Sequence, residues 1–116
     1  MDIIEKIDTT LEAALTPHNV QSFYGWYDSN INDTHVTFLQ LNDTDTDFED
    51  DEAGSKEYFI QVDIWSRENV EDLKEVIKES MKTIENCTYA QGQDFYETDT
   101  KIFHKALRFY IREEAA

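Results

Sequence analysis

The sequence is poor in the residues that make bridges and tight turns. Its 116 residues include one cysteine, Cys87, one proline, Pro17, and three glycines. A lone cysteine excludes an internal disulfide, which fits a reducing compartment. The scarcity of glycine and proline argues against a collagen-like or low-complexity chain and leaves little means of shaping a tight substrate loop.

Long apolar runs are also missing. No stretch approaches the ~18–20 apolar residues that a membrane-spanning helix needs. The N-terminal stretch MDIIEKIDTTLEAAL is acidic and amphipathic, with no basic region ahead of an apolar run, so we expect no secretory signal. These absences predict a soluble protein made in the cytosol, without a membrane partner.

Positive charge is scarce: 10 bases stand against 26 acids, for a net charge of −16. Phosphate backbones and anionic lipid headgroups would repel such a chain, which argues against non-specific nucleic-acid binding. The compatible roles are a protein that binds other proteins, a surface past which nucleic acid slides, and a mimic of nucleic acid.

What the sequence does contain predicts one folded domain over residues 1–116. Apolar residues make up 40% of the chain and aromatic residues 13%, which is enough for a packed core. Apolar residues at spacings of three and four predict a helix over residues 2–15, with Asp2 as its cap and Glu5 placed as in a capping box. Pro17 forbids its continuation.

The remaining pattern is one of strands and a second helix. Strands are predicted over 20–27 and 34–41, the second pairing back on the first, and then over 57–66, 87–97 and 102–113. A helix is predicted over 68–84, with Ser66 or Asn69 as its cap. The fold class is therefore α+β: two layers, a mostly antiparallel sheet of four to five strands packed by two helices on one face, in the order α-β-β-β-α-β-β.

Alternation along the strands divides core from surface. In 57–66, Tyr58 and the apolar residues at every second position after it are predicted to face the core, whereas Phe59 and Trp65 are expected to be half-exposed. In the last strand, Phe103, Leu107, Phe109 and Ile111 are expected to line one face, with Lys105 among them.

The stretch DTDTDFEDDE carries seven acids and no base. Its start resembles a calcium loop, but an EF-hand needs glycine at position six and glutamate at position twelve, where Phe48 and Gly54 stand. We therefore expect residues 43–56 to form a solvated, flexible acidic loop. Its seven acids are Asp43, Asp45, Asp47, Glu49, Asp50, Asp51 and Glu52.

Residues that carry chemistry form no recognisable site. None of the three histidines has a His or Cys at metal-ligand spacing, and Cys87 has no CxxC partner. The sequence contains no GxSxG, no phosphate-binding glycine loop and no HExxH. We expect no enzyme activity, no catalytic residue, no metal and no cofactor.

Aromatic residues remain as candidates for contact with other proteins, where such side chains are enriched. The candidate interface residues are Trp26, Phe48, Phe59, Trp65 and Tyr96. The alternative, left open by the sequence, is that about half of the aromatic candidates pack in the core.

Two segments resemble a family of phage proteins. YFIQVDIWS, followed by the amphipathic RENVEDLKEVIKESMKTI, is similar to a block in the tail-terminator or tail-completion (head–tail joining) proteins of tailed bacteriophages. The closing segment GQDFYETDTKIFHKALRFYI looks like the end of that family. The resemblance covers residues 57–113 and, more loosely, the N-terminal helix and the strands after it.

This resemblance implies a virion structural protein of a phage or prophage, held in the host cytoplasm before assembly and at the head–tail junction afterwards. Family members form a ring, typically of six copies, that caps the tail tube, docks on the head connector and lets the genome pass through its centre. The partners implied are other copies of the chain, the tail-tube protein and the connector. No catalytic residues come with the family.

Charge and resemblance together lead to a hypothesis for the acidic stretch. An acidic lumen would repel DNA, so DNA passes without being bound, and residues 43–52 are expected to line this channel or to become ordered in the ring. The same charge opposes assembly, so we expect a monomer in dilute, low-salt solution. Two alternatives remain: an acidic DNA mimic that inhibits a host nuclease, and a plain α+β adaptor for protein interactions.

Overall fold

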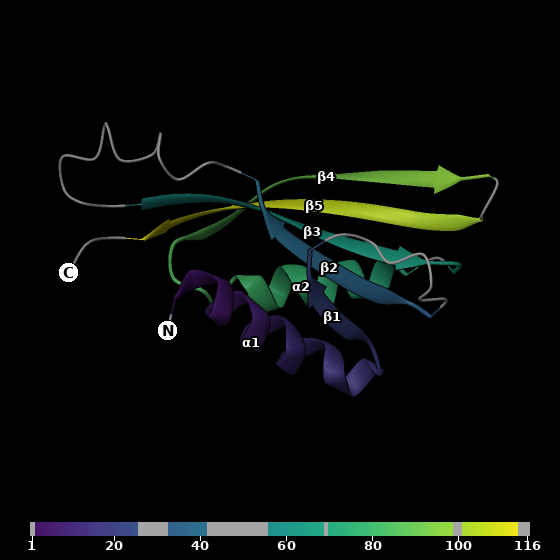
Figure 1. Ribbon diagram of the computed structural model, residues 1–116, viewed down its shortest axis with the longest axis horizontal. Coiled ribbons are helices and arrows are strands. Elements are labelled where there is room, and N and C mark those ends of the chain that lie inside the picture. The colour runs from purple at the N-terminus through teal and green to yellow at the C-terminus, as the bar shows by residue number, and fades with distance from the viewer. Residues whose placement is uncertain (1, 26–32, 42–55, 69, 99–100, 114–116) are drawn as a thin grey trace.

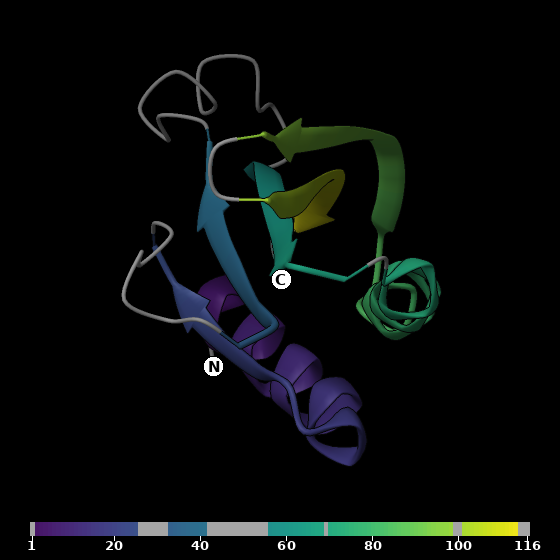
Figure 2. The same ribbon diagram turned by 90° about the vertical axis from the view of Figure 1, so that its right-hand side faces the viewer.

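The computed structural model describes residues 2–25, 33–41, 56–68, 70–98 and 101–113. A five-stranded sheet has the strand order β1-β2-β3-β5-β4, and both helices lie on the same side of it (Figures 1 and 2). The elements are α1 (Ile3–Leu15), a short 3₁₀ helix η1 (Thr16–His18), β1 (Gln21–Tyr24), β2 (His35–Gln40), β3 (Lys56–Ser66), α2 (Glu71–Met81), β4 (Cys87–Glu97) and β5 (Ile102–Glu113). The predicted α+β class and element order are confirmed.

Helix α1 begins and ends as the sequence predicts. The Glu5 amide donates to Asp2 Oδ1 at 2.8 Å, so the cap satisfies one of the N–H groups that a helix start leaves without a partner. The buried residues of α1 recur at every fourth position. Pro17 lies in η1, and Asn19 then turns the chain with a φ of 59°. The buried stripe is Ile3, Ile7, Leu11 and Leu15.

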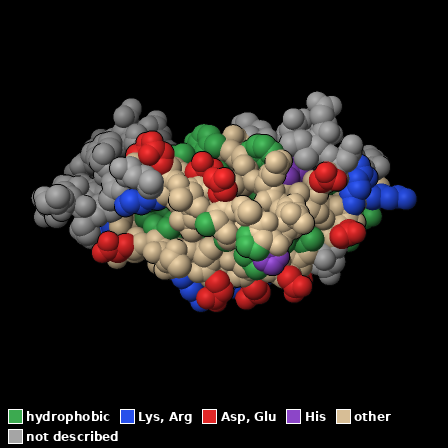
Figure 3. All heavy atoms as spheres, turned by 90° about the horizontal axis from the view of Figure 1, so that it is seen from below, with side chains coloured by type: hydrophobic (Ala, Val, Ile, Leu, Met, Phe, Trp, Pro, Cys, Tyr) green, Lys and Arg blue, Asp and Glu red, His purple; other side chains and the backbone are tan. Residues whose placement is uncertain are grey.

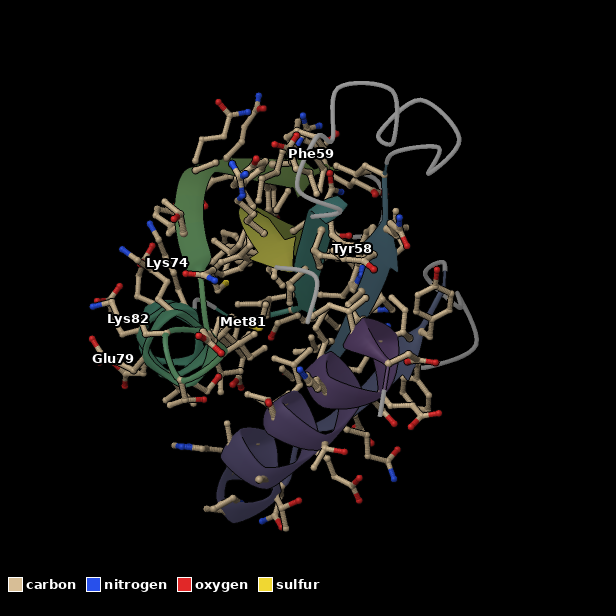
Figure 4. All side chains as sticks on the ribbon, turned by 90° about the vertical axis from the view of Figure 1, so that its left-hand side faces the viewer. Tyr58, Phe59, Lys74, Glu79, Met81 and Lys82 are labelled. Carbon is tan, nitrogen blue, oxygen red and sulfur yellow. The ribbon has the colours of Figure 1, made fainter. Side chains whose placement is uncertain are left out.

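Helix α2 starts later than predicted. Its N-cap is Val70, which makes no side-chain cap hydrogen bond. The prediction that Ser66 caps α2 is wrong, because Ser66 Oγ accepts from the Glu68 amide, ahead of the helix; the alternative, Asn69, lies outside the described residues. Figure 4 shows Met81 pointing inward, while Lys82 and Glu79 point away from the sheet.

The core lies between the sheet and the two helices. In β3 the predicted alternation is confirmed: Tyr58, Ile60, Val62 and Ile64 are buried. Figure 4 shows Tyr58 on the side of the helices and Phe59 on the other side. We call the side of the sheet that bears Phe59 the open face.

One predicted strand pairing is wrong. Strands β1 and β2 are parallel, with Gln21 opposite His35 and Tyr24 opposite Phe38, whereas the sequence suggested a hairpin. Residues 25–34 connect them, and this is longer than the two to five residues usual for hairpin loops. A connection of this length is compatible with two strands that run in the same direction.

Phe103 occupies the predicted face of β5, and it is 36% exposed there. The β4–β5 hairpin extends past the helices at one end of the molecule (Figure 1), so this part of the face has no helix to cover it.

Candidate functional site

The open face carries a hydrogen-bonded pair built on a buried carboxylate, which we call the Asp63–His104 cluster. The Asp63 side chain is 4% exposed, and His104 Nε2 lies 2.6 Å from its Oδ1. Gln61 Nε2 donates to both carboxylate oxygens, at 2.9 and 3.1 Å. A buried carboxylate is tolerated only when its oxygens are bonded, so these contacts explain how β3 can hold an acid here.

Aromatic rings hold His104 on both sides. Trp65 stacks on the imidazole with ring centroids 3.8 Å apart, and Phe95 stacks with a separation of 5.2 Å. The strand register explains this arrangement, because His104 is directly opposite both Trp65 in β3 and Phe95 in β4. Trp65 Nε1 also donates to Thr37 Oγ1 at 2.9 Å, which ties the cluster to β2.

An Asp–His pair could in principle act as a general acid–base. Here the ring is stacked on two aromatics and its Nε2 faces a buried carboxylate. We therefore interpret the Asp63–His104 cluster as a rigid patch that joins β2, β3, β5 and β4.

A second buried charge fixes the hairpin to α2. Lys105 Nζ donates to Glu71 Oε1 at 2.6 Å and to Asp94 Oδ1 at 3.1 Å, and its side chain is 7% exposed. Burial by itself lowers the pKa of Lys105, but the hydrogen bonds and charges of the two acids outweigh burial and raise it. The contribution to stability is therefore present at neutral pH and is lost as the pH rises through the raised value.

The end of the β4–β5 hairpin exposes aromatic rings on both faces. Tyr96 is 49% exposed and packs on Phe103, with ring centroids 4.7 Å apart, and Phe95 is 43% exposed on the open face. Carboxylates of Asp94 and Glu97 flank these rings. We call residues 94–97 and 101–103 the hairpin tip.

An apolar pocket lies toward the other end of the sheet. It has a volume of about 380 Å³, and the described residues that line it include no acid. Leu41 and Phe59, each 43% exposed, form part of its wall. A register shift between Tyr89 and Gln91 leaves Ala90 unpaired in β4 beside it. We call this the apolar pocket; its principal residues are Leu41, Phe59, Ile60, Ala90, Arg108 and Phe109.

The candidate interface residues are thus distributed over three places. Phe59 lines the apolar pocket, Trp65 belongs to the Asp63–His104 cluster, and Tyr96 lies at the hairpin tip. Trp26, Phe48 and the acidic residues 43–52 lie outside the described residues. The three described candidates therefore do not form one patch.

Sequence reasoning missed Asp63 and Phe95. The available signal for Asp63 was an acid in the middle of an apolar strand, together with a histidine in a later strand. Reading it required the β3–β5 register, which pairs Asp63 with Ala106 and places His104 diagonally beside it. Phe95 required the β4–β5 register in the same way.

Metal and thiol chemistry find no support in the part of the chain that the structure describes. No group of three or more His, Cys, Asp or Glu residues there could hold a metal ion. Burial raises the pKa of the Cys87 thiol to about 11, so the reactive thiolate is scarce at neutral pH. None of the described helices is long and apolar enough to cross a membrane.

Comparisons with known proteins match the fold only. No family model matches the sequence, and no curated protein does. Among solved structures, the chain is similar to one in the virion of a native gene transfer agent particle, with a TM-score of 0.59 and 10% sequence identity. The match covers 95% of this chain and 88% of that one. At this identity the likeness shows a shared fold, on which different functions can be built.

Proposed function

We propose that this chain is a structural protein of a tailed phage, a prophage or a related particle, and that a ring of its copies caps the tail tube and joins it to the head. The observation that carries the proposal is the fold likeness to a chain of a virion, which extends over nearly the full length of both chains. The resemblance of residues 57–113 to tail-terminator proteins supports the same assignment.

The described surface suits a protein that contacts other proteins. Large apolar side chains are exposed at both ends of the sheet, at the hairpin tip and at the apolar pocket. The sheet ends in β4, an eleven-residue strand whose outer edge has no neighbouring strand in the described part of the chain. Exposed strand edges and aromatic patches are typical places for contact with another subunit.

The net charge of −16 suits a conduit for DNA. Each phosphate contact that a channel makes would have to be broken during ejection, and carboxylates instead repel the duplex within a Debye length of ~8–10 Å. On this proposal, residues 43–52 face the channel, the genome passes unbound, and the chain performs no reaction and needs no cofactor.

The DNA mimic fits the described surface less well. A mimic needs carboxylates spread over a rigid face, but on α2 the acids alternate with lysines, with Glu75–Lys78 and Glu79–Lys82 as ion pairs. Figure 3 shows both acidic and basic side chains on the helix side, with the acidic ones more widespread. Salt-sensitive binding of a host nuclease would favour the mimic.

Assembly should depend strongly on ionic strength. We expect the purified chain to sediment as a monomer at micromolar concentration and low salt, because the like charges of neighbouring copies repel one another. At ~1 M salt the Debye length falls to ~3 Å and association should appear. Sedimentation velocity across a salt series measures this.

The matched control replaces the seven acids of residues 43–52 with their amides, which removes seven of the sixteen net negative charges. This variant should associate at a lower salt concentration than the natural chain. A hexamer that is already stable at low salt, or an unchanged salt dependence in the variant, would contradict the role assigned to charge.

A further inference from the structure

Two surfaces with exposed apolar side chains lie at opposite ends of the sheet. The hairpin tip projects past the helices at one end, and the apolar pocket lies toward the end where β3 begins (Figure 1). Both expose apolar side chains to solvent. The exposed side chains of both surfaces lie outside the core, although the buried Ile60 and Phe109 of the core form the floor of the apolar pocket.

We infer that these surfaces are complementary, and that the hairpin tip of one copy docks into the apolar pocket of the next. This inference rests on the proposed ring and names the contact that closes it. Because the two surfaces differ and lie far apart on one chain, their contact is head-to-tail. Contacts of that kind generate a closed ring when the rotation between copies permits closure.

Size supports this pairing. A volume of about 380 Å³ is at the lower end of the range for small-ligand pockets and suits one or two aromatic rings. The hairpin tip offers Tyr96 and its neighbour Phe103, which pack on each other and present one continuous apolar surface.

Charge supports it as well. Asp94 is paired with Lys105, and the sequence FYETDTK of residues 95–101 then holds two acids and one base. The wall of the apolar pocket holds Arg108, an exposed side chain whose Nε donates to Gln61 Oε1 at 3.2 Å. An acidic tip and a basic wall attract each other, although both belong to a chain that is negative overall. A second copy therefore fits the pocket better than a basic partner does.

The strength of the contact is limited, which agrees with a monomer at low salt. Aromatic side chains bury ~150–250 Å² each, so two of them fall well short of the ~1,200–2,000 Å² of a stable interface. A single tip–pocket contact is thus weak. Closure of a ring, in which every copy makes the contact twice, adds to its stability.

A pair of variants tests the inference at ~1 M salt, where repulsion is screened. Tyr96→Ser removes an anchor from the tip, and Ala90→Trp fills the pocket with an added ring. Each variant alone should associate about 30-fold or more weakly than the natural chain, as expected for loss of a main anchor of an interface. Sedimentation velocity measures the association.

Mixing the two variants gives the sharpest result. The pocket-filled chain keeps its tip and the tip-truncated chain keeps its pocket, so one contact forms and no further copy can add. At a protein concentration high enough to populate a single weak contact, a mixture should therefore give a heterodimer and nothing larger, whereas the natural chain gives larger species.

Matched controls separate the contact from general effects on folding. Tyr24→Ser removes a more exposed tyrosine, 57% exposed, from the other end strand, and Ala13→Trp adds the same ring on the solvent side of α1. Both should associate as the natural chain does, and circular dichroism should show all four variants folded.

Three results would overturn the inference. They are unaltered assembly of both tip and pocket variants, equal weakening by the controls, and a natural chain that stays monomeric at high salt and high concentration. Unaltered assembly of the variants would leave the proposed ring standing on other contacts, so failure of this inference is distinct from failure of the proposed function.

Discussion

Asp63→Ala is expected to lower the free energy of unfolding by about 3 kcal/mol, because it removes a buried carboxylate and leaves its hydrogen-bonding partners unsatisfied. The substitution removes the acceptor for His104 and for the amide of Gln61, both packed on the open face. Chemical denaturation at neutral pH measures the change. The slope of the transition should be the same for the variant and the natural chain.

The double-mutant cycle with His104→Phe isolates the pair itself. Phenylalanine keeps a ring between Trp65 and Phe95 but offers no nitrogen to Asp63, so this variant should be destabilised by about 2–3 kcal/mol. The double variant Asp63→Ala/His104→Phe should lose about 1–3 kcal/mol less than the sum of the two single losses. Strict additivity would mean that the two residues do not stabilise each other.

Loss of the chain from a particle should have the largest effect of all. In a phage or prophage that carries a deletion of this gene, we expect joined, infectious particles to disappear almost completely. If the chain caps the tail tube as proposed, its loss leaves nothing to end tube growth or to bind the head connector, so overlong tails and separate heads should accumulate. Negative-stain electron microscopy of lysates measures the tail lengths and the fraction of joined particles.

Supplying the natural chain from a plasmid is the control, and it should restore both tail length and joining. Supplying the Tyr24→Ser chain should do the same, since Tyr24 lies far from the hairpin tip. Joined particles with tails of normal length in the deletion strain would rule out the capping role.

The helices and the long strands followed from local patterns. Asp2 and the four-residue repeat of apolar residues determine α1, and alternation from Tyr58 to Ile64 determines the core face of β3. These features depend only on neighbours along the chain, so the sequence was sufficient to predict them.

Features that depend on register escaped prediction. The parallel β1–β2 pair is a contact between strands that local pattern does not specify, and the exposure of Phe103 depends on where α2 begins relative to the hairpin. The Asp63–His104 cluster joins residues on two strands that are separated by a helix and a third strand. Each of these requires the strand order, which local propensity does not contain.

The candidate interface was predicted only in part for the same reason. Phe59 and Tyr96 are exposed as expected of contact residues, yet the apolar pocket and the hairpin tip are formed by partners such as Ala90 and Phe103, which lie on other strands. A list of aromatic residues cannot show which of them share a surface.

The most direct test of the structural role is a cryo-electron microscopy map of the head–tail junction in intact particles that carry this chain. The proposal predicts a ring of copies around the tail axis, between the tube and the connector, with each hairpin tip in contact with the next copy and with residues 43–52 toward the channel. A ring with the acidic residues on its outer wall would contradict the role of the charge. Particles from which the chain is absent would contradict the proposed function itself.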